Sequence, residues 1–103
     1  MVEYFTKFTV QKGQGDALEN ILMEASKNTR TAPECILFVV ARSPEDEDAV
    51  WTTEIWTSNE AEAAAMEKPE IKEITNKLLP ILQGAPTRTG VRLVGGKGLP
   101  LVR

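Results

Sequence analysis

The stretch ILFVVARSPEDEDAVWTTEIW, residues 36–56, decides the fold of this chain. It opens with a continuous apolar run over residues 36–41, which is typical of a strand that is covered on both faces. A polar segment with Pro44 and the acidic run 45–48 follows, and residues 50–56 then alternate between two sides. Two strands joined by a polar loop predict an antiparallel hairpin.

The two sides of residues 50–56 differ in chemistry. One side carries Val50, Thr52, Glu54 and Trp56, and the other carries Trp51, Thr53 and Ile55. A buried carboxylate must be paired, solvated or protonated. Glu54 beside the indole of Trp56, under a helix, is therefore the most site-like feature of the sequence. For Trp56 taken alone, the plainer interpretation is a core residue.

The segment before the hairpin predicts a strand and a helix. Residues 2–11 alternate as a strand, and Gly13 and Gly15 break this pattern. Residues 16–31 then carry apolar side chains at helical spacing. The approach to Pro33 ends this helix, because the residue before a proline is biased away from helical geometry.

The segment after the hairpin predicts more helix and a last strand. Ser58 is expected to cap a short helix that runs through Met66. Pro69 suits the first position of a further helical segment, which Pro80 ends. Residues 87–94 predict the last strand.

The element order β-α-β-β-α-β predicts the α+β class, with a ferredoxin-like four-stranded antiparallel sheet and both helices on one face. We expect one domain over residues 1–94, followed by a glycine-rich tail over residues 95–103. Two helices cover only one face of such a sheet, whereas Trp51 and Ile55 lie on the side opposite Trp56. A second copy of the chain is expected to cover that side.

Composition excludes several classes of protein. The net charge of -3 and the pI of about 5.0 argue against nucleic-acid and anionic membrane partners. No apolar run is long enough to span a membrane, and the start Met1–Tyr4 lacks signal-peptide anatomy. The single cysteine, Cys35, rules out an internal disulfide. We therefore expect a cytoplasmic protein.

The chain has no histidine. This excludes a Ser-His-Asp triad and the usual histidine-containing zinc sites, and it removes the commonest general base. The acidic run 45–48 lacks the spacing of a calcium loop, so we predict no metal site. Cys35, without a histidine or an evident basic neighbour, is predicted to be a small core residue.

Several short motifs, in this order and spacing, resemble the antibiotic biosynthesis monooxygenase family. They are FTVQKG at 8–13, PEC at 33–35, RSPED at 42–46 and EIWTSNEA at 54–61. The resemblance covers about residues 2–94. It implies a homodimeric α+β barrel in which two sheets face each other and each pocket lies between a sheet and its helices.

The resemblance also implies a chemistry. Characterised members of the family oxygenate electron-rich aromatic substrates without metal or flavin. We therefore expect a monooxygenase that needs no cofactor and oxidises a quinol or polycyclic phenol with O₂, so that its partners are a second copy and a small aromatic substrate.

The expected site combines the family pattern with the strand faces. Trp56 matches the tryptophan that lines family pockets, and Glu54 is its polar partner; these two are the predicted catalytic residues. The predicted substrate-binding residues are Thr6, Phe8, Phe38, Arg42, Met66 and Ile74. Thr6 stands where haem-degrading relatives have an asparagine, and those relatives bind haem through a helix histidine that this chain lacks.

Two alternatives remain open. The absence of histidine favours a non-catalytic dimer that binds a small aromatic ligand or a partner protein. A haem-binding relative that uses Met66 or Cys35 is the other. A cavity beside Trp56 discriminates between an enzyme and a protein whose tryptophan is only part of the core.

Overall fold

The predicted hairpin is the centre of the fold. In a computed structural model, which describes residues 1–99, β2 (Cys35–Arg42) and β3 (Ala49–Trp56) pair antiparallel. The other elements are β1 (Val2–Thr9), α1 (Gly15–Thr29), α2 (Asn59–Met66), α3 (Pro69–Leu78), the 3₁₀ turn η1 (Leu79–Ile81) and β4 (Thr87–Arg92).

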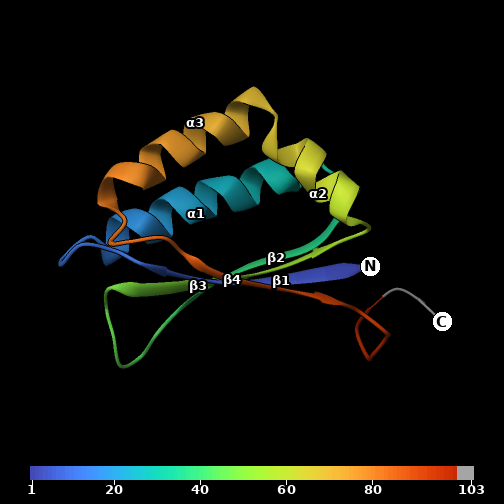
Figure 1. Cartoon of the computed structure of the whole chain (residues 1–103), viewed down its shortest axis with the longest axis horizontal. Helices are drawn as coiled ribbons and strands as arrows, with labels where there is room; N and C mark the ends of the chain where they lie inside the picture. The colour runs from blue at the N-terminus through green and yellow to red at the C-terminus, as the bar shows by residue number, and fades with distance from the viewer. Residues whose placement is uncertain (100–103) are drawn as a thin grey trace.

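The sheet has the strand order β2-β3-β1-β4, and all its pairings are antiparallel. Its helices lie together on one face, and no described element covers the other (Figure 1). This is the ferredoxin-like α+β arrangement that the element order predicts, so the predicted fold class is confirmed. Among the described residues, no helix is long and apolar enough to cross a membrane.

The helices form where local sequence and burial agree. Leu18, Leu22 and Ala25 recur on one side of α1 and are buried against the sheet. The Oγ of Ser58 accepts a hydrogen bond from the backbone N–H of Ala61 at 3.1 Å, which caps α2.

Some element ends differ from the expected ones. β1 stops at Thr9 because Val10 leaves the ladder and forms an isolated bridge with Leu82. β4 stops at Arg92, short of the predicted end at 94. Of the predicted tail, residues 95–99 form no helix or strand, and residues 100–103 lie outside the described part of the chain.

The end of the hairpin is fastened to the start of α1. Arg42 Nη1 lies 2.9 Å from Asp16 and 3.1 Å from Glu19, and its Nη2 donates to the carbonyl oxygen of Glu47 at 2.8 Å. Gly15 allows this approach, because a Cβ there would overlap the same carbonyl group.

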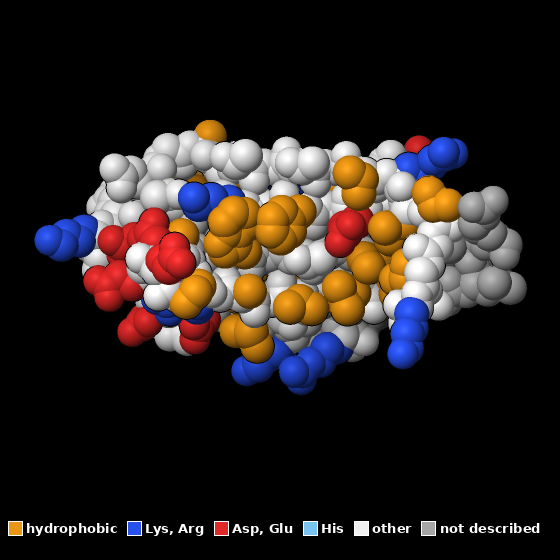
Figure 2. Space-filling view, turned by 90° about the horizontal axis from the view of Figure 1, so that it is seen from below, with side chains coloured by type: hydrophobic (Ala, Val, Ile, Leu, Met, Phe, Trp, Pro, Cys, Tyr) orange, Lys and Arg blue, Asp and Glu red, His pale blue; other side chains and the backbone are white. Residues whose placement is uncertain are grey.

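The uncovered face of the sheet is mainly apolar (Figure 2). The rings of Phe5 and Trp51 stack on it with their centroids 5.0 Å apart. Phe5 is 46% exposed, Val39 44% and Val91 48%. The apolar run of β2 is therefore covered on its helix side only within a single chain, and a large apolar surface is left open.

Candidate functional site

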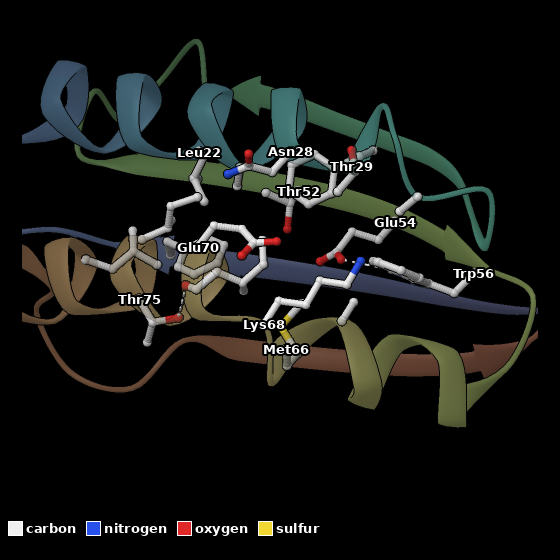
Figure 3. A pocket seen from close by; sticks show the side chains of 18 residues that line it. Leu22, Asn28, Thr29, Thr52, Glu54, Trp56, Met66, Lys68, Glu70 and Thr75 are labelled. Atoms are coloured by element: carbon white, nitrogen blue, oxygen red, sulfur yellow. Dashed lines mark hydrogen bonds between the residues drawn. The ribbon is translucent and has the colours of Figure 1, made fainter.

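A cavity of about 120 Å³ lies between the helices and the sheet, beside Trp56 (Figure 3). The strands supply its floor through Phe8, Phe38, Thr52, Glu54 and Trp56. Side chains of α1, the end of α2 and α3 form the opposite wall. The lining is mainly apolar, so a polar group inside it is conspicuous.

Glu54 and Trp56 form the polar pair of this cavity. The period of two along β3 turns both side chains toward the helices. Trp56 is only 1% exposed, and its Nε1 donates a hydrogen bond to Oε1 of Glu54 at 3.0 Å. One carboxylate oxygen is therefore held by the protein, and the carboxylate faces the cavity (Figure 3).

Burial raises the pKa of the Glu54 carboxyl above its ordinary value of 4.5. The hydrogen bond from Trp56 and the positive charge of Arg88 oppose this rise, whereas the negative charge of Glu62 adds to it. Arg88 itself bonds Glu62 at 2.8 Å and lies 3.8 Å above the ring of Tyr4. Glu54 is thus a stronger base than an exposed glutamate.

Thr52 is the second polar group of the cavity floor. Its side chain is 1% exposed, and its Oγ1 has no hydrogen-bond partner among the described protein groups. The hydroxyl points into the cavity (Figure 3). Buried hydroxyls normally have a partner, so this one stands out from the rest of the core.

The family of this chain follows from its sequence. The sequence profile of the antibiotic biosynthesis monooxygenase family matches residues 1–77. The chain belongs to this family. A candidate antibiotic biosynthesis monooxygenase from Chloroflexus aurantiacus is 32% identical with a TM-score of 0.84, and the match covers 96% of this chain and 98% of that one.

More distant solved structures share the fold. A candidate from Deinococcus radiodurans is 16% identical over 97% of this chain and 99% of its own, with a TM-score of 0.82. A Mycobacterium tuberculosis protein is 15% identical over 94% of this chain and 98% of its own, with a TM-score of 0.84. No curated protein is significantly similar to the chain.

The residues expected from the family pattern fall in two places. Those that line the cavity with Glu54 and Trp56 are Phe8, Phe38, Met66 and Ile74. Thr6 is buried opposite Thr52 in the strand register, outside the cavity lining. Arg42 lies at the hairpin end, bound to α1, and is also outside the lining. We therefore leave Thr6 and Arg42 out of the proposed site.

The mouth of the cavity carries groups that we did not predict. Lys68 and Glu70 flank the start of α3, and Asn28 and Thr29 face them from α1 (Figure 3). For Lys68 and Glu70, the sequence signal was the helix start at Pro69, because both residues are next to it in the chain. That signal does not show which part of the molecule the helix start faces. The entrance is thus charged and the floor is mainly apolar.

Of the two candidate haem ligands, Cys35 does not suit that role. Met66 lines the cavity, but Cys35 does not, and its Sγ lies 3.5 Å from the carbonyl oxygen of Leu37. Burial raises the pKa of the Cys35 thiol, and the charge of Glu54 adds to this. Because the thiolate is the form that ligates metal, Cys35 is a poor axial ligand.

The raised pKa of Glu54 also affects the stability of the fold. A raised pKa means that the folded state binds the Glu54 proton more tightly than the unfolded state, so this stabilisation is present at low pH and is lost as pH rises through the folded-state pKa. Glu54→Gln keeps an acceptor for Trp56 and carries no charge. We expect the variant to be more stable than the native protein at about pH 8, with a difference that shrinks toward about pH 5. Urea unfolding across this range checks it, and a difference independent of pH contradicts it.

Proposed function

We propose that this protein is a monooxygenase that inserts one oxygen atom from O₂ into a quinol or other electron-rich phenol, with no resident cofactor. The observation that carries the proposal is the half-buried Glu54 carboxylate, held by Trp56 and facing a mainly apolar cavity. Such a group can accept a phenolic proton once a bound aromatic ring has displaced water from the cavity.

The proposed reaction uses the substrate as its own reductant. Glu54 takes the proton of the phenol, and the phenolate gives one electron to O₂. The resulting radical pair recombines to a C–O bond at a ring carbon that bears hydrogen. The O–O bond then breaks, one oxygen stays on the ring as a carbonyl, and the other leaves as water with the displaced ring hydrogen and the proton returned by Glu54. All four electrons that reduce O₂ come from the substrate, and the phenol and O₂ yield a quinone and water.

Cavity size bears on the substrate. An apolar cavity of roughly 150 Å³ holds benzene, and the cavity beside Trp56 is about 120 Å³. One aromatic ring therefore suits the enclosed part. Further rings of a polycyclic phenol would extend past Lys68 and Glu70 at the mouth.

Oxygen consumption tests the proposal. With a panel of hydroquinones and anthrones, we expect one O₂ consumed per substrate, and one atom of ¹⁸O₂ in the product with the other in water. Removing metals with a chelator should leave the rate unchanged. A folded protein that consumes no O₂ with any member of the panel contradicts the proposal.

We also propose that the protein is a homodimer whose two uncovered sheet faces pack together. The support is the apolar character of that face, with the Phe5–Trp51 stack at its centre and Val39 and Val91 exposed beside it. An antiparallel sheet can present one face to water, but it then carries polar side chains on that face. A second copy offers a face of the same chemistry.

The alternative is that the protein is a non-catalytic dimer, which binds an aromatic ligand without converting it to a product. The absence of histidine favours it, since the commonest acid–base side chain is missing. Binding of phenols to the cavity without oxygen consumption would support this alternative over the enzyme.

A further inference from the structure

The hydroxyl of Thr52 is an unexplained polar group in the floor of the cavity. The side chain is 1% exposed, its Oγ1 has no partner among the described protein groups, and it points into the cavity (Figure 3). A buried hydroxyl without a partner destabilises a fold, and valine would fill the same space without that penalty. A polar residue in this position suits a partner that arrives with the ligand.

The spacing along β3 indicates where that partner lies. Thr52 and Glu54 occupy successive positions on the same face of the strand, where ideal strand geometry puts their Cα atoms roughly 6.8 Å apart. One ligand oxygen with two hydrogen bonds of about 2.8 Å can bridge two groups up to about 5.6 Å apart, which is comparable to this backbone spacing. Since Trp56 already occupies Oε1 of Glu54, a ligand oxygen between the two side chains can face Oε2 on one side and the threonine hydroxyl on the other.

We infer that Thr52 is a substrate-positioning residue, whose hydroxyl donates a hydrogen bond to the same phenolic oxygen that gives its proton to Glu54. The inference rests on the proposed function for the identity of the ligand as a phenol. A neutral phenol can donate to Glu54 and accept from Thr52 at once. After the proton moves, the phenolate keeps the bond from Thr52, and this bond becomes stronger because its acceptor is charged.

The inferred role also defines the ligand class more closely. The cavity floor would select an aromatic ring with a hydroxyl directed at β3, and it would discriminate against the same ring with a methyl group in that place. A site built to bond a hydroxyl rejects the analogue without it, because the polar groups of the site are then left unpaired.

A matched pair of probes tests this without turnover. Binding of p-cresol and of p-xylene, which differ by a hydroxyl and a methyl group, is measured by NMR titration in the absence of O₂. In the native protein we expect p-cresol to bind more tightly. Thr52→Val should weaken p-cresol binding about tenfold and leave p-xylene binding unchanged within about twofold. Thr52→Ser, which keeps the hydroxyl, should stay within about threefold of the native affinity for p-cresol.

A purely structural role for Thr52 predicts a different result. If the hydroxyl only stabilises the fold, Thr52→Val lowers the thermal midpoint and weakens both probes alike. We expect the opposite, a midpoint of the free protein about 4 °C or more higher, because an unpaired buried hydroxyl has been removed. Thr52→Ala provides a second variant without the hydroxyl should the valine variant fail to fold.

The other possible results of the binding experiment either support or overturn the role inferred for Thr52. Equal loss of the two probes, unchanged p-cresol affinity in Thr52→Val, or no binding of p-cresol to the native protein overturns it. Selective loss of p-cresol in a protein that consumes no O₂ with any phenol leaves the inference standing and contradicts the proposed oxygenation. The two failures are therefore distinguishable.

Discussion

Glu54→Gln should lower the rate of phenol-dependent oxygen consumption by about a hundredfold or more. The amide keeps an oxygen that accepts the hydrogen bond from Trp56, so the geometry of the cavity floor is retained. It cannot take up the phenolic proton, and loss of a positioned base typically costs 10²–10⁴ in rate, that is, roughly two to four orders of magnitude. Initial rates of O₂ consumption at saturating substrate measure the effect.

The control for this variant is Glu70→Gln, which removes a carboxylate at the mouth of the same cavity. We expect its rate to stay within about threefold of native, because Glu70 is exposed and is not placed on the cavity floor. The pH profile adds a second check. The native rate should rise with pH through the raised pKa of Glu54, and this limb should be missing in Glu54→Gln. Equal rates for Glu54→Gln and the native protein contradict the assignment of the base.

Val39→Glu should convert the proposed dimer to a monomer. Val39 is 44% exposed on the uncovered sheet face, where the symmetry of a homodimer would bury both copies of the new carboxylate. Each unpaired buried charge costs several kcal/mol, so the dimer dissociation constant should rise by more than about a hundredfold. Sedimentation equilibrium over a concentration series measures it.

Met23→Glu is the matched control for this change. Met23 is 41% exposed, but it lies on α1, on the helix side of the molecule. The same charge there should leave the association state unchanged. A native protein that is monomeric at all concentrations, or a Met23→Glu variant that dissociates as readily as Val39→Glu, contradicts the proposed interface.

The sequence predicts the hairpin and one side of the cavity because strand periodicity is local. Alternation along β3 is enough to place Glu54 and Trp56 on one face, and the helices must then lie over that face. The break between α2 and α3 follows from Pro69 in the same way, since proline suits the first position of a helix.

Strand periodicity predicts which face of the sheet a side chain lies on better than it predicts how far along the strand it lies from the site. Arg42 shares the helix-facing side of β2 with Phe38, but it pairs with Val50 whereas Phe38 pairs with Glu54. Periodicity therefore gives the face of Arg42 and does not give its distance from the site. That distance is set by the ion pairs with α1, which depend on tertiary packing.

The place of Lys68 and Glu70 could not be predicted from the sequence for a related reason. Their place at the cavity mouth depends on how α3 crosses the sheet, which is decided by apolar residues such as Ile74 packing against the floor. Nothing in the local sequence of residues 68–70 encodes that crossing. The lack of a hydrogen-bond partner for Thr52 among the described residues could not be predicted either, because it depends on the surroundings of the hydroxyl in the folded protein.

The hydroxyl of Thr52, which has no partner within residues 1–99, has a consequence for protein engineering. A laboratory selection that rewards heat resistance alone would favour valine at this position, because the free protein gains from losing an orphan polar group. The more thermostable variants from such a selection would bind hydroxylated rings more weakly. Libraries intended to preserve turnover should therefore hold position 52 fixed, or be screened with the phenol present.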